Sequence, residues 1–191
     1  MRLYDRNLQN YISTTYPGAE YICAHTYHHR PYYLQKDFGG LNDCSLMSIS
    51  YMIKVLYPKK NINDIYNKTE AAAKKFFYND KIGTIPFFIN SIIGKAFNIN
   101  SFGKMVKNVG FKPKDIVKAV PYQPIILSMY SDGNNYYKNH SVSVVGYRKY
   151  KWNGKDLYFF EVRDNWNSTA SYVDYQKMSC ISSINYVKNS N

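Results

Sequence analysis

The sequence lacks long apolar segments and paired cysteines, and these absences exclude whole classes of protein. The longest apolar runs span only a few residues, as in Ile125-Ile126-Leu127, far short of the roughly 20 residues of a transmembrane helix. Residues 1–6 hold no apolar core of a secretory signal, which predicts a cytoplasmic protein, or a secreted one if the chain is a trimmed mature form. Three cysteines cannot form a closed set of disulfides, so a free thiol is expected.

Dense basic runs are also missing, although the net charge is +12. The densest clusters are pairs such as Lys59-Lys60 and Lys74-Lys75. Basic residues that are distributed this evenly are typical of a solvated surface. Aromatic residues, 17% of the chain, are able to stack on single-stranded nucleic acid, but here they recur at helical spacing, which indicates a core. We therefore expect no nucleic-acid partner, and a basic nucleic-acid- or peptide-binding module is a distant alternative.

The first half of the chain reads as helical. Its length of 191 residues suits a single domain with one core. Apolar residues recur at helical spacing after Ser45 up to Pro58, and Thr84 is a candidate N-cap with Pro86 in the first turn of its helix. The predicted helices cover about 5–12, 45–57, 63–78, 84–96 and 113–120.

The second half reads as strands, with turn signals between them. Strands are predicted at 123–129, 140–150 and 157–164, with extended segments at 21–26 and 172–187. Helices early and antiparallel strands late describe an α+β domain with two lobes. We expect a mainly helical lobe over 1–110 and a mainly β lobe over 111–191.

A hairpin connects the strands 140–150 and 157–164 through Asn153-Gly154. The apolar faces that contain His140 and Asp164 match across the hairpin only if the loop has an odd number of residues. We therefore expect a three-residue loop with Gly154 left-handed. Counting back from this loop places His140 opposite the segment 164–166, within cross-strand reach.

Cys44 stands at the start of the predicted helix 45–57. A helix N-terminus and a nearby imidazolium both favour the thiolate, so Cys44, His140 and Asp164 are the parts of an activated cysteine nucleophile. Taken singly, each has a more common structural explanation as a buried thiol, a strand-end histidine or a turn-forming aspartate. Their joint occurrence in suitable settings favours catalysis.

The segment from Cys23 to His29 is the competing candidate for chemistry. Cys23 and His25 would share one face of a strand, with His28 or His29 within reach. The spacing matches no standard zinc motif and lacks a second ligand pair. A packing segment is therefore favoured, and we expect neither a metal nor a cofactor.

Several short motifs together resemble the papain-like cysteine peptidases. They are residues 31–35, the pair Asp43-Cys44 heading a helix, the segment His140–Tyr147, and Asp164-Asn165-Trp166. The most similar branch is the bacterial group related to the peptidases that cleave double-glycine leaders from bacteriocins. The resemblance covers about residues 31–166. It implies a papain-like two-lobed α+β fold, with the nucleophile helix in one lobe and the histidine on the sheet of the other.

The resemblance also implies roles for individual residues. Cys44 would be the nucleophile, and His140 the general base and later the acid. Asp164 would orient His140, and Trp166 would shield that pair from water. Asn165 is an alternative orienting residue if the strand is shifted by one position, although the parity of the strand favours Asp164.

For the oxyanion hole, the resemblance implies Gln35 together with the backbone N–H of Cys44. Asn42 is a competing donor, because the glutamine of papain itself stands closer to the cysteine than Gln35 does here. The family's usual glycine after the cysteine is Ser45 in this chain.

The implied activity is cleavage of a peptide or small amide through a thioester on Cys44. An acyltransferase or amidase of the same fold would use the same three residues and stays an open alternative. A member that binds peptides without cleaving them is disfavoured, because Gln35, Cys44, His140 and Asp164 are all assigned.

Overall fold

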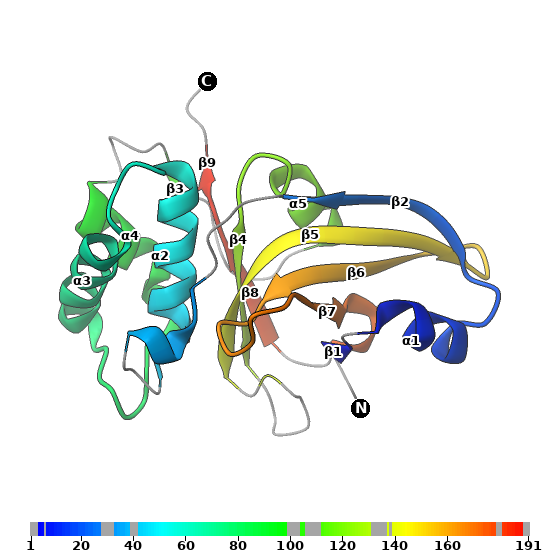
Figure 1. Cartoon of the computed structure of the whole chain (residues 1–191), viewed down its shortest axis with the longest axis horizontal. Helices are drawn as coiled ribbons and strands as arrows, with labels where there is room; N and C mark the ends of the chain where they lie inside the picture. Colours follow the sequence, from blue (N-terminus) through cyan, green and yellow to red (C-terminus); the bar gives the residue numbers. More distant parts are fainter. Residues whose placement is uncertain are drawn as a thin grey trace.

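The computed structural model describes residues 4–5, 7–27, 33–38, 42–98, 104–105, 112–130, 137, 139–178 and 181–188. It confirms the α+β class, with a group of helices beside an antiparallel sheet (Figure 1). Three helices pack together beside the sheet: α2 (Cys44–Leu56), α3 (Ile62–Ala73) and α4 (Ile89–Phe97). Two shorter ones are α1 (Leu8–Thr15) and α5 (Pro113–Ala119).

The main sheet follows the strand order β1-β7-β6-β5-β4-β8, and every pairing is antiparallel. Its strands are β1 (Tyr4–Asp5), β2 (Glu20–Thr26), β4 (Ile125–Tyr130), β5 (His140–Trp152), β6 (Lys155–Arg163), β7 (Ser171–Asp174) and β8 (Ile181–Asn185). A separate pair joins β3 (Lys104–Met105) to β9 (Val187–Lys188). The predicted division at residue 110 stays a prediction.

Two strands share one edge of the long strand β5. Its first residues pair with β4 and its later residues with β2. The changeover falls at Gly146, where a Cβ atom would lie only 2.6 Å from the carbonyl oxygen of His25. Only glycine allows this close approach of the two backbones. β5 therefore extends far beyond β4, and its start, which pairs with β4, lies beside α2.

The β5–β6 hairpin differs from the expected three-residue loop. Trp152 pairs with Lys155, so Asn153 and Gly154 form a two-residue loop in which both have positive φ. The register instead shifts by one residue between Val144 and Gly146, which leaves Val145 as the extra residue of a bulge. The predicted three-residue loop is therefore wrong. The extra residue that brings the two apolar faces into register is the bulged Val145, not a third residue of the loop.

The apolar faces nevertheless match as the sequence pattern requires. Val142, Val144, Phe160 and Val162 pack in one buried cluster under α5. The register of the hairpin, continued beyond Ser143 and Arg163, brings His140 to the segment that follows β6. The bulged residue Val145 packs instead against α2.

Several predicted element boundaries need correction. α1 begins at Leu8, because Asn7 caps it, and α3 ends at Ala73 before a short 3₁₀ turn, η2 (Lys74–Phe76). Thr84 is not a helix cap: Ile85 is extended, and the chain enters α4 through the 3₁₀ turn η3 (Pro86–Phe88). Proline disfavours helical conformation in the residue before it, so the helix starts later than predicted.

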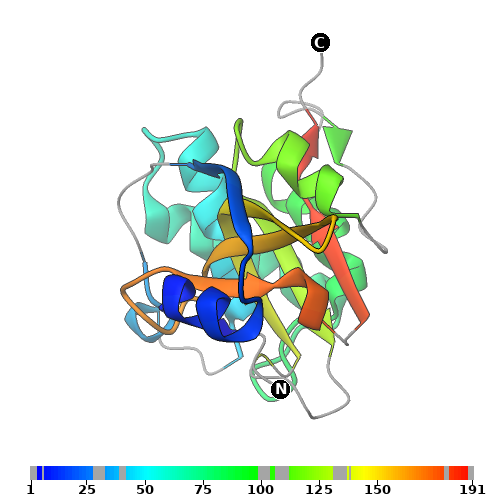
Figure 2. The same ribbon diagram turned by 90° about the vertical axis from the view of Figure 1, so that its right-hand side faces the viewer.

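α1 packs at the end of the β5–β6 hairpin that is remote from α2, beside β7 (Figure 2). The strands predicted around 125, 140 and 157 are present, as are the extended segment before Thr26 and the helix beginning at Pro113. Within the described ranges, no helix has the length and apolar character needed to cross a membrane.

Candidate active site

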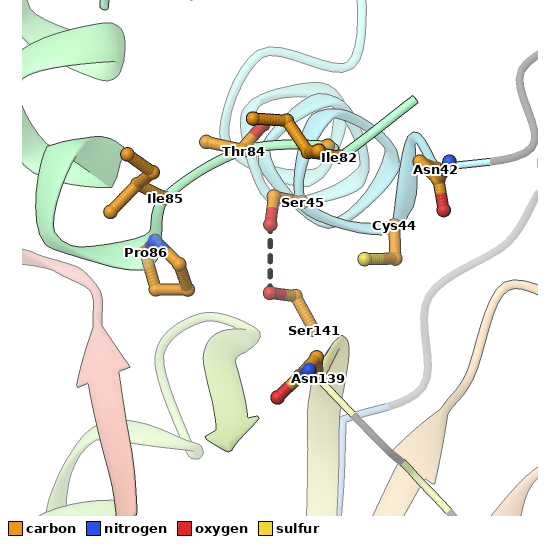
Figure 3. Close-up of a pocket in the computed structure, with 10 residues that line it drawn as sticks. Asn42, Cys44, Ser45, Ile82, Thr84, Ile85, Pro86, Asn139 and Ser141 are labelled. Atoms are coloured by element: carbon orange, nitrogen blue, oxygen red, sulfur yellow. Dashed lines mark hydrogen bonds between the residues drawn. The ribbon is translucent and has the colours of Figure 1, made fainter. Parts of the chain in front are cut away.

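Cys44 is the first residue of α2 and lies beside the start of β5. The side chain is partly exposed and lines a pocket together with Ser45 and Ser141 (Figure 3). The first backbone N–H groups of a helix have no partner within the helix, so the start of α2 presents donors at this point. The thiol therefore stands where negative charge is favoured.

The surroundings of Cys44 lower the pKa of its thiol. Burial by itself would raise the pKa, but a hydrogen bond with His140 and the charge of that imidazole oppose this effect. The backbone N–H of Ser141 and the side chain of Ser45 add to the lowering. These interactions favour the thiolate, which is the nucleophilic form of cysteine.

His140 is buried and is held by the main chain of Asp164. Its Nε2 lies 2.8 Å from the carbonyl oxygen of Asp164, and a carbonyl only accepts, so Nε2 carries a proton. Nδ1 is then the nitrogen left for Cys44. The ring of Trp166 stacks on the imidazole at a centroid distance of 3.8 Å, so it covers one face of His140.

Asp164 lies beside His140, but its carboxylate has other partners. Oδ1 accepts the backbone N–H groups of Trp166 and Asn167, and Oδ2 accepts Asn167 Nδ2 at 2.8 Å and the hydroxyl of Tyr137 at 3.2 Å. The carboxylate thus fixes the turn after β6. That turn aims the Asp164 carbonyl at His140, so Asp164 orients the ring through its main chain.

Asn165 contacts the first turns of α2, where Cys44 lies. The left-handed backbone of this residue, with φ of 64°, ends the alternation of β6. Its Nδ2 donates to the carbonyl of Cys44 at 3.3 Å and to Ser48 Oγ at 3.1 Å. Asn165 therefore ties the turn after β6 to the first turns of α2.

Gln35 is buried and is anchored to the same turn. It begins the 3₁₀ turn η1 (Gln35–Asp37), and its backbone N–H donates to the carbonyl of Asn165 at 2.8 Å. Asn165 also contacts Cys44. Gln35 is thus linked to Cys44 through one intervening residue.

Asn42, the alternative oxyanion donor, has its amide engaged elsewhere. Its Nδ2 donates to the carbonyls of Asp80 at 2.7 Å and Lys81 at 3.0 Å, which uses both amide protons. Gly83, with φ of +75°, approaches so closely that a Cβ atom there would lie 2.9 Å from the Asn42 carbonyl. Asn42 therefore holds the segment 79–83 beside Cys44.

The pocket beside Cys44 has a volume of about 290 Å³. One wall is apolar and comes from the segment before α4, while the opposite side carries the start of β5 (Figure 3). Its lining residues are Asn42, Cys44, Ser45, Ile82, Gly83, Thr84, Ile85, Pro86, Asn139 and Ser141. Ile82 and Ile85 are also exposed to solvent.

Sequence reasoning missed a set of serines that join α2 to the sheet. Ser45 Oγ and Ser128 Oγ each lie 2.8 Å from Ser141 Oγ, and Ser48 Oγ donates to the Ser141 carbonyl at 3.3 Å. All four are buried. The signal in the sequence is a small polar residue directly after Cys44 and another directly after His140, where a tight contact between helix and strand needs small side chains.

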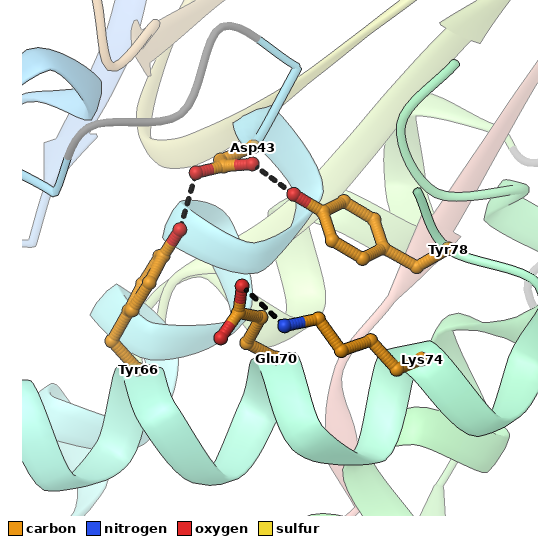
Figure 4. A network of polar contacts seen from close by, with 5 residues as sticks. All are labelled: Asp43, Tyr66, Glu70, Lys74 and Tyr78. Carbon is orange, nitrogen blue, oxygen red and sulfur yellow. Dashed lines mark hydrogen bonds and ion pairs between the residues drawn. The ribbon is translucent and has the colours of Figure 1, made fainter. Parts of the chain in front are cut away.

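Asp43 was also missed as part of the site (Figure 4). Its carboxylate is buried and accepts the hydroxyls of Tyr66 on α3 and Tyr78. Burial, and then the hydrogen bond to Asp43, raise the pKa of both tyrosines, which therefore stay protonated donors. An aspartate before a helix normally suggests a cap, which concealed this arrangement.

Only part of the segment Cys23–His29, the alternative candidate for metal binding, lies within the described residues. Cys23 and His25 lie on β2, and His25 stacks against Tyr147, whereas His28 and His29 lie outside the described residues. The described part of the chain has no group of three or more histidine, cysteine, aspartate or glutamate residues placed to hold a metal ion. Cys23 and Cys44 are free thiols, and Cys180 lies outside the described residues.

Comparison with models of known protein families and with curated proteins found no match for this sequence.

Proposed function

We propose that this protein is a papain-like cysteine peptidase that cleaves a peptide or small amide bond through a thioester on Cys44. The observation that carries the proposal is that Cys44, at the start of α2, lines one pocket with Asn139 and Ser141, the two chain neighbours of His140. The lowering of the Cys44 pKa by His140 agrees with this placement. The two-lobed arrangement of the family is part of the proposal. It is supported by a helical layer and an antiparallel sheet that meet at this pair.

In the proposed reaction, the thiolate of Cys44 attacks the carbonyl carbon of the substrate. His140, protonated at both nitrogens, then donates the Nδ1 proton to the leaving amine, and the C–N bond breaks to leave a thioester. His140 next takes a proton from water, whose oxygen attacks the thioester. Carboxylate product leaves and the Cys44 thiolate is restored beside protonated His140.

The oxyanion that forms in both attacks needs fixed donors. The backbone N–H of Cys44, in the first turn of α2, is one candidate. Gln35 is favoured over Asn42 as the second, because the Asn42 amide protons already bind the carbonyls of Asp80 and Lys81. The bond from the Gln35 backbone to Asn165 supports this choice by fixing η1 next to the nucleophile.

The pocket supports a substrate with an aliphatic group next to the scissile bond. Ile82, Ile85 and Pro86 form its apolar wall, and Cys44 stands at its edge. A volume of about 290 Å³ is near the lower limit of ordinary ligand pockets, which suits one side chain rather than a whole small molecule.

The decisive experiment compares wild type with Cys44→Ala on a mixture of synthetic peptides, in water enriched in heavy oxygen, by mass spectrometry. Hydrolysis places solvent oxygen in the new carboxylate, whereas transfer to an added amine does not. We expect cleavage by wild type and loss of at least about a thousandfold of the rate in Cys44→Ala. The matched control is Cys23→Ala, which removes the free thiol on β2 and should cleave normally.

Iodoacetamide alkylation supplies a test that needs no substrate. Because the pKa of Cys44 is lowered, it should react already well below the ordinary cysteine pKa of about 8.5, and His140→Ala should abolish that advantage. Undiminished peptide cleavage by Cys44→Ala, or a Cys44 no more reactive than Cys23, would overturn the proposal.

A further inference from the structure

The turn that follows β6 contacts each of the three elements that carry the candidate catalytic groups. The carbonyl of Asp164 lies 2.8 Å from His140 Nε2 on β5, and the ring of Trp166 stacks on the same imidazole. Asn165, between these two residues, contacts α2 and η1 instead. Three consecutive residues thus join β5, α2 and η1 at one point.

Asn165 reaches α2 through its side chain. Its Nδ2 donates to the carbonyl of Cys44 at 3.3 Å and to Ser48 Oγ at 3.1 Å, which uses both amide protons on this helix. The two acceptors are four residues apart, so they lie on the same face of α2, one turn from each other. A single amide therefore holds the first turns of the helix at two points.

The main chain of Asn165 makes the third connection. Its carbonyl accepts the backbone N–H of Gln35 at 2.8 Å. The backbone is left-handed, with φ of 64°, a conformation that asparagine and glycine adopt more readily than other residues. Because Asn165 is only 2% exposed, water does not compete for these bonds. An asparagine at this position supplies both the backbone conformation and the amide that the contacts need.

We propose that Asn165 is a positioning residue, which fixes Cys44 relative to His140. Through its carbonyl it also places η1 next to the start of α2. The inference rests on the proposed function, since it concerns the same nucleophile. Asn165 is not among the described residues that line the pocket beside Cys44, so it acts through the groups that it places. A displacement of reacting groups by about 1 Å can lower a rate about a hundredfold.

The test is the pH dependence of Cys44 alkylation by iodoacetamide, resolved by peptide mass spectrometry. Asn165→Gly removes the amide and keeps a residue that readily adopts positive φ. We expect the pH of half-maximal alkylation to rise by about one pH unit, because a displaced imidazole stabilises the thiolate less. Where the thiol is fully ionised, the variant should react like wild type.

Peptide hydrolysis supplies a second measurement. Because Asn165 holds Cys44 and η1 in place rather than binding the substrate, Asn165→Gly should lower kcat about tenfold and change KM less than about twofold. A merely structural loss of folded protein would also lower the apparent kcat. It would leave the alkylation profile of the folded molecules unchanged.

Asn153 provides the matched control for the backbone. It is an asparagine with φ of 48° in the loop at the other end of the β5–β6 hairpin. Asn153→Gly should therefore keep the wild-type alkylation profile and the wild-type kcat.

Ser48→Ala removes one acceptor of the Asn165 amide and serves if Asn165→Gly does not fold. It should raise the pH of half-maximal alkylation by about half a pH unit. Combined with Asn165→Gly, it should add nothing further, because the two side chains share one hydrogen bond. Its control is Ser50→Ala, since Ser50 is buried on the same helix and its hydroxyl has no hydrogen-bond partner in the described ranges.

The outcomes separate the role of Asn165 from the proposed function. A reactive wild-type Cys44 whose profile is unchanged in Asn165→Gly, or in Ser48→Ala if the first variant does not fold, overturns that role and leaves the peptidase proposal standing. Equal shifts in Asn165→Gly and Asn153→Gly also overturn it, because the effect would not depend on the contacts with α2. A wild-type Cys44 no more reactive than Cys23 overturns the activated nucleophile itself.

Discussion

Two buried aspartates in this protein each accept hydrogen bonds from two tyrosine hydroxyls. They lie in different parts of the molecule and have different effects on the chain that follows them. Asp43 precedes Cys44 and accepts Tyr66 and Tyr78. Asp174 lies on β7, on the side of the molecule away from α2, and accepts Tyr11 at 2.9 Å and Tyr16 at 2.7 Å (Figure 1). Both carboxylates are almost fully buried.

The difference lies in what each carboxylate does for the turn that follows it. Asp174 also caps its turn, since Oδ1 accepts the backbone N–H of Gln176 at 2.9 Å. Asp43 heads α2 without any side-chain cap. Tyr66 and Tyr78 each bind one oxygen of the Asp43 carboxylate, so this carboxylate does not cap the first N–H groups of α2. Asp174 therefore stabilises the turn after β7, whereas Asp43 leaves the start of α2, where Cys44 stands, without a side-chain cap.

The largest effect should come from removing either carboxylate. Asp43→Ala and Asp174→Ala each leave two tyrosine hydroxyls without their acceptor, and each should lower the free energy of unfolding by about 3 kcal/mol. Urea denaturation measures this loss. Asp156→Ala is the control, because its ion pair with Lys149 is at the surface and should contribute less than about 1 kcal/mol. A loss of stability in only one of the two variants would contradict the view that both carboxylates stabilise the fold in the same way.

The tyrosine pairs should separate the two roles. Tyr66→Phe with Tyr78→Phe, and Tyr11→Phe with Tyr16→Phe, should each cost about 2 kcal/mol of stability. Only the first pair frees Asp43 to bind the start of α2, where its charge opposes the thiolate. Alkylation of Cys44 at a pH below its pKa should then slow about tenfold in that double variant. Equal reactivity in both double variants would show that Asp43 has no influence on the nucleophile.

The smallest effect concerns the pH dependence of stability at Asp174. Burial raises the pKa of this carboxyl, although the hydrogen bonds from Tyr16, Tyr11 and Gln176 act in the opposite direction. The folded state therefore binds this proton more tightly than the unfolded state, and stability falls as the pH rises through the folded pKa. Asp174→Asn should make the free energy of unfolding less dependent on pH in the mildly acidic range. An unchanged slope would contradict this assignment.

Much of the fold followed from local patterns. The helix at Cys44 and the two strands of the hairpin were predicted because periodicity, Pro58 and Asn153-Gly154 are all local signals. The loop length was wrong, because the bulge at Val145, which packs against α2, has no recognisable signal in the local sequence. Thr84 failed as a cap because Pro86 restricts the residue before it, which made this error avoidable.

The candidate site, like the fold, was predicted from the sequence only in part. The sequence indicated that Cys44, His140 and the segment at Asp164 would meet, and these three are brought together. It did not indicate that the Asp164 carbonyl contacts His140, that Asn165 reaches Ser48, or that Asn42 binds Asp80 and Lys81. Such partners come from segments far apart in the chain.

The sequence by itself determined the α+β class, a thiol at a helix start, and a histidine opposite the end of the next strand. These follow from alternation, helical spacing and turn residues, which act over a few neighbouring positions. Only the tertiary structure decided which atom of Asp164 holds the imidazole, where the Asp43 carboxylate points, and that Ser45, Ser141 and Ser128 align. Hydrogen bonds depend on positions within a few tenths of an ångström, and those positions are fixed only when α2 packs against β5.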